Sequence, residues 1–175
     1  MDEIASKLGM SKRTIYQHFS DKEDILVYFL ESTQKMQFEQ LAKMEKTLPT
    51  VIDIFLEVLQ QHKDLESYYN IKFQEDIEKL FSKAHSVWLK QIETSTTMLK
   101  EFLELGIKQG VVRPDLNIEV AAFLLQDTNN TYLHASRMVA RPFTIWELFN
   151  TMMINFIRGI STQEGLKIID KYLNA

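Results

Sequence analysis

The chain has 175 residues, of which 45% are hydrophobic, 11% aromatic and 25% charged, and this composition is typical of an ordinary soluble globular protein. It contains no cysteine, which excludes thiolate metal sites, disulfides and cysteine nucleophiles and fits a cytoplasmic protein. No stretch approaches the ~18 continuous apolar residues of a membrane helix, and the N-terminus lacks the layout of a signal peptide, so no membrane partner is expected. The net charge of −4 gives no global sign of nucleic-acid binding, so any contact with DNA must come from local charge.

Helical periodicity runs through the whole sequence. Glycine and proline are scarce, at five and three residues, and no alternating strand pattern lies between them. The predicted fold class is therefore all-α, with a short-helix module followed by a bundle of longer helices. In chain order the predicted helices cover residues 1–8, 11–19, 21–46, 49–63, 66–81, 83–109, 117–138, 144–159 and 162–174.

Several helix boundaries carry start or stop signals. Gly110 and Gly159 stand where a helix would end in a left-handed residue. The segment from Arg113 to Asp115, with its central proline, is predicted to be a loop. Three stretches fit the capping box, in which a hydroxyl and a carboxylate satisfy free N–H groups, namely Ser20 with Glu23, Thr144 with Glu147, and Ser161 with Glu164.

The first 19 residues have the layout of a helix-turn-helix. A helix of about two turns is followed by a short turn with Gly9 and by a second short helix. Gly9 permits the positive φ angle that a sharp turn needs, and Ser11 is predicted to cap the second helix. Ala5 is small where the second helix crosses, and Ile15 is expected to point back and lock the pair.

The second helix is predicted to present hydrogen-bond donors outward. Lysine, arginine, threonine, glutamine and histidine suit phosphates and base edges, and a recognition helix carries such groups on its N-terminal half. The alternative is a plain corner of two helices with a solvated basic face. The outward residues are Lys12, Arg13, Thr14, Gln17 and His18.

The stretch IASKLGMSKRTIYQHFSDKEDIL, residues 4–26, closely resembles the helix-turn-helix of the TetR family of bacterial transcriptional regulators. The segment GIKQGVVRPDLNIEVAAFLL is similar to a recurrent bend before the dimer helices of that family. The matching residues of the first stretch are Ile4, Ala5, Gly9, Ser11, Tyr16, His18, Phe19, Lys22 and Leu26.

The resemblance implies a homodimeric repressor whose helix-turn-helix binds a palindromic double-stranded DNA operator and is released by a small molecule. It implies a DNA-binding domain over residues 1–24 and a regulatory and dimerisation domain over residues 25–175. Family members carry a further helix before this motif, so the resemblance also implies that the chain lacks its natural N-terminus. The expected contacts are to the major groove from Lys12, Arg13, Thr14 and Gln17, and to phosphates from Ser11, Tyr16, His18 and Lys22.

Two other classes of protein compete with a regulator. A helical-bundle enzyme or metal carrier is disfavoured, because the Glu-x-x-His pairs of di-iron bundles and the His-Glu-x-x-His motif of zinc proteases are both absent. We therefore expect no catalytic residue, no metal and no cofactor. The alternative that stays open is a helical adaptor or small-molecule-binding protein that does not bind DNA.

The late helices are predicted to form the dimer interface. Over residues 145–160 the apolar side chains cover roughly half of the helical wheel, which exceeds the stripe of a surface helix. Residues 118–125 are apolar almost all round, and a central core helix in a monomer is the alternative for this pattern. The predicted interface residues are Ile118, Ala122, Leu125, Phe149, Met152, Met153 and Phe156.

An effector pocket is predicted inside the bundle. Ser95 and Asn129 interrupt apolar stripes, and buried polar groups must find partners. Ligand sites combine an apolar lining with a few such groups, so the effector is expected to be small and largely apolar. The alternative is that both residues bond across helices. The predicted lining is Phe55, Tyr69, Phe73, Trp88, Ser95, Phe102 and Asn129.

Overall fold

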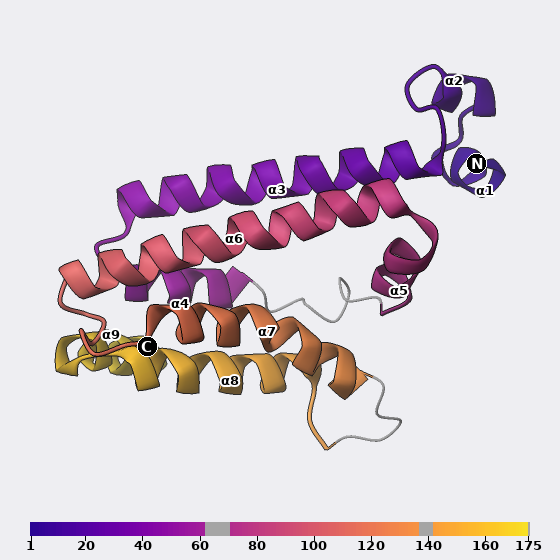
Figure 1. The fold of residues 1–175 in the computed structure, drawn as a ribbon. Helices are drawn as coiled ribbons and strands as arrows, with labels where there is room; N and C mark the ends of the chain where they lie inside the picture. The colour runs from indigo at the N-terminus through magenta and orange to yellow at the C-terminus, as the bar shows by residue number, and fades with distance from the viewer. Residues whose placement is uncertain (62–70, 137–141, 175) are drawn as a thin grey trace. The chain divides into compact units, whose positions relative to one another are not determined.

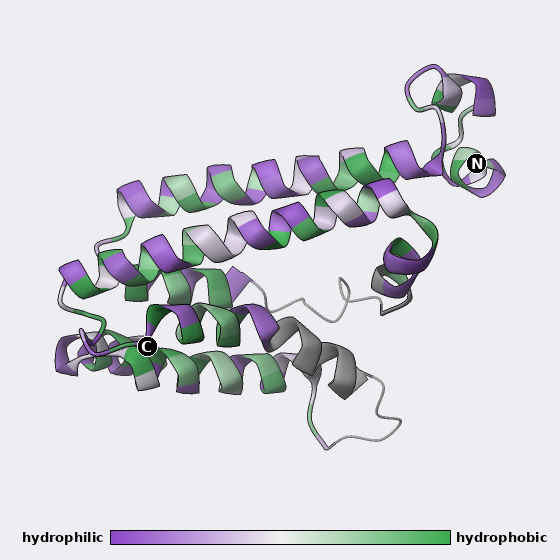
Figure 2. Ribbon diagram, in the orientation of Figure 1, coloured by the Kyte–Doolittle hydropathy of each residue, from purple (hydrophilic) through white to green (hydrophobic). Residues whose placement is uncertain are grey.

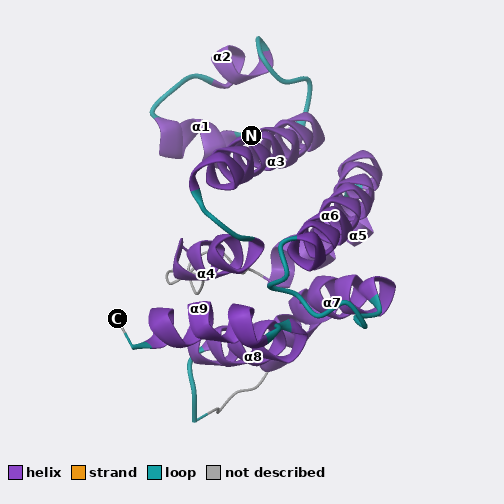
Figure 3. Ribbon diagram, turned by 90° about the vertical axis from the view of Figure 1, so that its left-hand side faces the viewer, coloured by secondary structure: helices purple, strands orange, loops and turns teal. Residues whose placement is uncertain are grey.

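The computed structural model describes residues 1–61, 71–136 and 142–174, without the side chains of residues 71, 72, 74, 128–136 and 145. These ranges form helices and contain no β-strand, which confirms the all-α prediction (Figures 1 and 3). Each predicted helix corresponds to an observed one, although residues 62, 63, 66–70, 137 and 138 of the predicted helices lie outside the described ranges. The described helices are α1 Asp2–Leu8, α2 Lys12–Tyr16, α3 Lys22–Thr47, α4 Val51–Gln61, α5 Ile71–Leu80, α6 Ser82–Lys108, α7 Ile118–Ser136, α8 Ile145–Ile160 and α9 Gln163–Leu173.

The chain divides into two compact units. The first contains residues 1–39 and 72–91, and the second contains residues 40–71 and 92–175. Helices α3 and α6 each contribute to both units. The functional boundary predicted after residue 24 rests on a different criterion and stays a prediction. Within the described helices, none is long and apolar enough to cross a membrane.

The core of the first unit is small and comes from three helices. Leu30 of α3, Ile77 of α5 and Ala84 of α6 are buried, with Ile77 only 1% exposed. Apolar side chains meet in such a cluster because removing them from water is favourable by roughly 25 cal/mol per Å². The half-buried residues around it are Leu26, Val27, Phe73, Phe81, Val87 and Trp88.

The core of the second unit is larger and has α4 at its centre. Ile52 and Leu59 of α4 are fully buried, and α4 packs against α8 and α9. Figure 2 shows hydrophobic residues along much of α8, whose Ile157 is also fully buried. Replacing Ile157 by alanine would therefore cost about 2–5 kcal/mol of stability.

A bend between α6 and α7 is tied to the α8–α9 connection. Gly110 has a φ of 73°, as predicted for a helix that ends in a left-handed residue. Val112, which is 1% exposed, pairs with Ser161 in an isolated antiparallel bridge. The backbone N–H of Thr162 donates to the carbonyl of Val111 at 3.0 Å. These contacts satisfy backbone groups that the ends of the helices leave free.

The helix ends test the predicted boundary signals. The capping box of Thr144 with Glu147 is confirmed, and the N–H of Thr144 lowers the pKa of the Glu147 carboxyl. The box predicted to begin at Ser161 is wrong, because the hydroxyl of Thr162 caps α9 and that of Ser161 donates to a carbonyl of α8. The stop predicted at Gly159 is also wrong, since α8 continues past it.

Candidate nucleic-acid interface

The first 16 residues form the predicted helix-turn-helix. Gly9 ends α1 with a φ of 63°, the left-handed conformation that glycine adopts without steric cost. The chain then turns, and the hydroxyl of Ser11 accepts a hydrogen bond from the N–H of Thr14 at 3.1 Å. The predicted turn and cap are both confirmed, and each depends on residues less than four positions apart.

Two buried side chains hold α1 against α2. Ala5 is 6% exposed and Ile15 is 5% exposed, and the two helices are in contact. The methyl group of Ala5 leaves room for the crossing helix. Because Ile15 faces inward, the opposite side of α2 faces solvent.

That outer face carries most of the predicted DNA contacts. Tyr16 is 52% exposed, so its ring is open to solvent. Thr14 is half-buried, and its hydroxyl lies 2.9 Å from that of Ser11. The other predicted contact residues are exposed, namely Ser11, Lys12, Arg13, Gln17 and His18 on or next to α2 and Lys22 at the start of α3.

Lys12 has a partner within the protein. Its ammonium group forms an ion pair with the carboxylate of Asp2 at the start of α1, and both side chains are largely exposed. An exposed ion pair of this kind contributes little to stability. The lysine can therefore exchange Asp2 for a phosphate or a base edge at small cost.

The chemistry of this face suits double-stranded DNA. Arginine and lysine bind guanine and phosphate, and glutamine binds adenine. Hydroxyl groups donate to base edges in the groove or to the phosphates of the DNA backbone. Helix α2 is short, but its hydrogen bonding continues through the N–H of Phe19 to the carbonyl of Ile15 at 3.0 Å. Gln17 and His18 therefore stand on the same helical turn as the residues before them.

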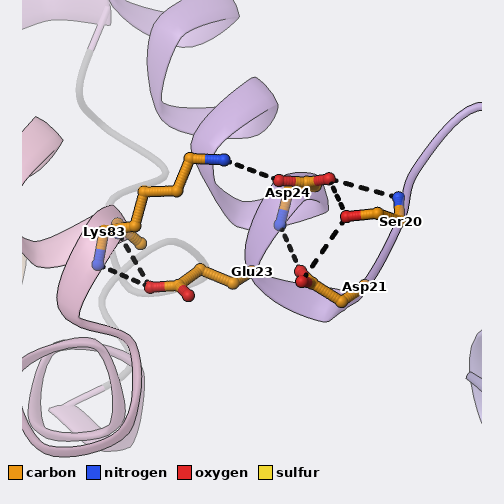
Figure 4. A network of polar contacts seen from close by, with 6 residues as sticks. Ser20, Asp21, Glu23, Asp24 and Lys83 are labelled. Atoms are coloured by element: carbon orange, nitrogen blue, oxygen red, sulfur yellow. Dashed lines mark hydrogen bonds and ion pairs between the residues drawn. The ribbon is translucent and has the colours of Figure 1, made fainter.

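A polar network joins the start of α3 to the start of α6 (Figure 4). Asp21 accepts from the N–H of Asp24 at 2.9 Å, so the capping box predicted from Ser20 and Glu23 is wrong. Asp24 accepts from the N–H of Ser20 at 3.2 Å and pairs with Lys83 at 2.7 Å. Lys83 and the Ser20 donors lower the pKa of Asp24 to about 2, and Asp24 raises the pKa of Lys83. The sequence carries no local signal of the contacts with Lys83, because Lys83 lies about 60 positions from Glu23 and Asp24.

A cavity of about 240 Å³ lies within the first unit between α1, α3 and α5. Phe73, which was predicted to line an effector pocket, is on its wall. Lys22, a predicted DNA contact, also lines this cavity. The remaining lining residues are Ile4, Ile25, Leu26, Asp76, Ile77 and Phe81.

The other residues predicted to line the effector pocket are distributed over both units. Trp88 belongs to the first unit and lies against its core, with the ring of His85 6.0 Å away. Phe55, Ser95 and Phe102 are half-buried in the second unit. The side chain of Asn129 and all of Tyr69 lie outside the described residues. The effector pocket stays a prediction.

Two buried amides were not singled out from the sequence. The Nε2 atoms of Gln34 on α3 and Gln91 on α6 are buried and lack a hydrogen-bond partner among the described residues. A buried donor without a partner costs about 1–3 kcal/mol. Their signal in the sequence is weak, because a glutamine on a long helix is usually exposed.

The predicted dimer residues are mostly half-buried in the second unit. Ala122 is fully buried, and Ile118 packs against the core. The ring of Phe149 lies 6.1 Å from that of Trp146. Leu125 and the remaining α8 residues, Met152, Met153 and Phe156, are half-buried.

The exposed apolar side of α7 is a different one from the predicted side. Val120 is 52% exposed, Phe123 is 64% exposed and Leu124 is 54% exposed. Their spacing of three and four residues places them on one face of the helix. The dimer interface itself stays a prediction.

Comparison with known proteins finds a family match for the helix-turn-helix. Residues 1–29 match the family model for bacterial regulatory proteins of the tetR family. The chain is 26% identical over 134 residues to the HTH-type transcriptional repressor KstR2 of Rhodococcus jostii, covering 72% of this chain and 64% of that repressor. The chain therefore spans just under two thirds of the length of this relative.

Solved structures show the same fold. A TetR-family regulator from Agrobacterium tumefaciens is similar with a TM-score of 0.76 and 14% identity, over 92% of this chain and 86% of that one. A transcriptional regulator from Saccharomonospora viridis, in complex with choline, is similar with a TM-score of 0.72 and 19% identity, over 93% and 86%. The family model thus confirms the resemblance of residues 4–26 to the TetR helix-turn-helix, and the solved structures show that the fold of the chain is similar to that of TetR-family regulators.

Proposed function

We propose that this protein is a ligand-responsive repressor that binds a palindromic DNA operator as a homodimer in the bacterial cytoplasm. The observation that carries the proposal is the geometry of α1 and α2, in which Ala5 and Ile15 are buried and the donor-bearing side of α2 is exposed. The similarity to a transcriptional repressor supports it. The protein has no catalytic role in this proposal.

Dimerisation would come from α7 and α8. The exposed face of Val120, Phe123 and Leu124 is apolar, and contiguous apolar surface on a helix is a common site of association. Two copies of these helices would make a four-helix interface. A dimer of this type places two recognition helices roughly 34–36 Å apart, or a multiple of that distance, on one face of the DNA.

The effector would be a small and largely apolar molecule with a hydrogen-bond acceptor. Apolar residues dominate the predicted lining, and the amides of Gln34 and Gln91 offer donors that have no partner in the described part of the protein. The similar Saccharomonospora viridis regulator was solved with choline, so the fold accommodates small molecules. Release would follow if the effector bound more tightly to an arrangement that does not fit DNA.

Binding of labelled upstream DNA at several salt concentrations tests the proposal. Lys22→Ala should weaken binding to every sequence alike and reduce the slope of log K against log salt by about one, because one phosphate contact is lost. Lys35→Ala removes the same charge from an exposed site on α3 and serves as the control. A change in sequence preference with an unchanged slope would contradict the phosphate role of Lys22.

The alternative is an adaptor or small-molecule-binding protein without DNA binding. It would be favoured if the protein bound no fragment from its own gene neighbourhood at low salt, where electrostatic contacts with DNA are strongest.

A further inference from the structure

Helix α6 begins directly after an apolar residue. The helix starts at Ser82, and the residue before it is Phe81, whose side chain has no oxygen that could cap the helix. The first N–H groups of a helix have no partner inside the helix. Those of Lys83 and Ala84 therefore need an acceptor from elsewhere.

Glu23 supplies that acceptor from another helix. Its Oε1 atom accepts from the N–H of Lys83 at 2.6 Å and from the N–H of Ala84 at 3.1 Å (Figure 4). A carboxylate is well suited to this position, because the N-terminus of a helix carries partial positive charge and charge-assisted hydrogen bonds are strong. Glu23 thus stands where an N-cap would stand, from a position 60 residues earlier in the chain.

Asp24 extends the connection toward the recognition helix. Its Oδ1 atom accepts from the ammonium group of Lys83 at 2.7 Å, and its Oδ2 atom accepts from the N–H of Ser20 at 3.2 Å. Ser20 directly follows Phe19, whose N–H closes the last turn that continues α2. Hydrogen bonds through Lys83 and Asp24 therefore link the first turn of α6 to Ser20, the residue that follows the last turn of the recognition helix.

We propose that Glu23 and Asp24 are positioning residues for DNA binding, which hold the exit of the recognition helix on the N-terminus of α6 and do not themselves touch DNA. This inference rests on the proposed function. The junction belongs entirely to the first unit, and α6 continues from it to Lys108. A displacement of α6 would thus be transmitted to Ser20 by the same hydrogen bonds.

The sign of the effect separates this role from simple electrostatics. A carboxylate near DNA repels phosphates, so removing one should leave binding unchanged or make it tighter. The positioning role predicts weaker binding on removal, because the recognition helix loses its fixed orientation and a smaller fraction of the protein is competent to bind.

The experiment compares Glu23→Ala with Glu31→Ala, which removes the same charge from an exposed site two turns further along α3. DNA affinity, its salt dependence and hydrogen exchange at the amides of Lys83 and Ala84 are measured on the full chain. For Glu23→Ala we expect faster exchange at both amides, affinity weaker by about threefold or more, and an unchanged salt slope. Glu31→Ala should bind DNA no more weakly than the wild type. Glu23→Gln, which retains the Oε1 acceptor, should recover most of the affinity.

Other outcomes would contradict either the cap by Glu23 or its positioning role. Faster exchange with undiminished DNA affinity would leave Glu23 as a structural cap and overturn the positioning role. Unchanged exchange would show that the cap is not made. If Glu23→Ala does not fold, Asp24→Asn replaces it, and we expect the same loss of DNA affinity. Tighter binding of DNA by Asp24→Asn would contradict the positioning role. If the wild type binds no DNA, the proposed function fails, and the exchange of the two amides still reports on the junction.

Discussion

The carbonyl oxygen of Val111 lies so close to Gly165 that a Cβ atom added to this glycine would be 2.3 Å from it. The contact joins the bend after α6 to the first turn of α9, which are more than 50 positions apart in the chain. The oxygen belongs to the backbone and cannot move aside without displacing the bend.

Gly165→Ala should therefore destabilise the second unit by about 1–3 kcal/mol, the usual cost of overpacking. Thermal or denaturant unfolding measures the effect. Gly159→Ala is the matched control, since a Cβ there meets nothing within 4 Å and alanine favours a helix by up to about 1 kcal/mol. Equal midpoints for the two variants would contradict the close contact.

The pair of Asp24 and Lys83 should make stability depend on pH at both extremes. The pKa of Asp24 is lowered from 3.8 to about 2, so its contribution is present above about 3.8 and is lost as the pH falls toward 2. The pKa of Lys83 is raised from 10.5, so its contribution is present below 10.5 and is lost at higher pH.

NMR titration of the carboxyl groups measures the pKa of Asp24 directly. In Lys83→Met the pKa of Asp24 should move back toward 3.8 only in part, because the hydrogen bonds from Ser20 remain. An Asp24 pKa that did not change in this variant would show that the ion pair is not formed in solution.

Asp2 should compete with DNA for Lys12. Asp2→Asn frees the ammonium group, and an exposed ion pair of this kind corresponds to a gain in DNA affinity of roughly twofold to fivefold. Glu3→Gln removes the same charge from the next residue of α1, so the difference between the variants isolates the ion pair from the general field. DNA titrations at one salt concentration suffice, and equal affinities for the two variants would count against the competition.

Phe123 should be central to self-association. It is 64% exposed on α7, and Phe123→Glu places a charge on the face proposed for the dimer. We expect association to weaken by roughly 30-fold, the size of a hot-spot substitution. Sedimentation measures it, with Met36→Glu as the control, since Met36 is 68% exposed on α3 in the first unit. A wild-type chain that is monomeric at micromolar concentration would refute the dimer.

Sequence reasoning succeeded where the cause of a structure is local. The turn at Gly9, the cap by Ser11 and the box of Thr144 with Glu147 each involve residues within four positions. The helices were predicted from apolar residues that recur at helical spacing and therefore lie on one face of each helix. The inward position of Ile15, and hence the outward face of α2, follows from the same periodicity.

It was less successful on α7, where periodicity carries little information. Because residues 118–125 are apolar on almost every side of the helix, a helical wheel does not distinguish the side that packs against the core. The structure buries Ala121 and Ala122 and exposes Val120 and Phe123. The small alanines allow neighbouring helices to approach, and the larger side chains are left outside.

By itself the sequence determined the all-α class, the order of the helices, the helix-turn-helix and its resemblance to a family, because each depends on residues that are close together in the chain. Only the tertiary structure decided which side of α7 is covered and which oxygen caps α6. Glu23 has the ordinary spacing of a capping box with Ser20, yet its carboxylate binds Lys83. The choice depends on where packing brings α6, and residues 60 positions apart carry no local signal of that distance.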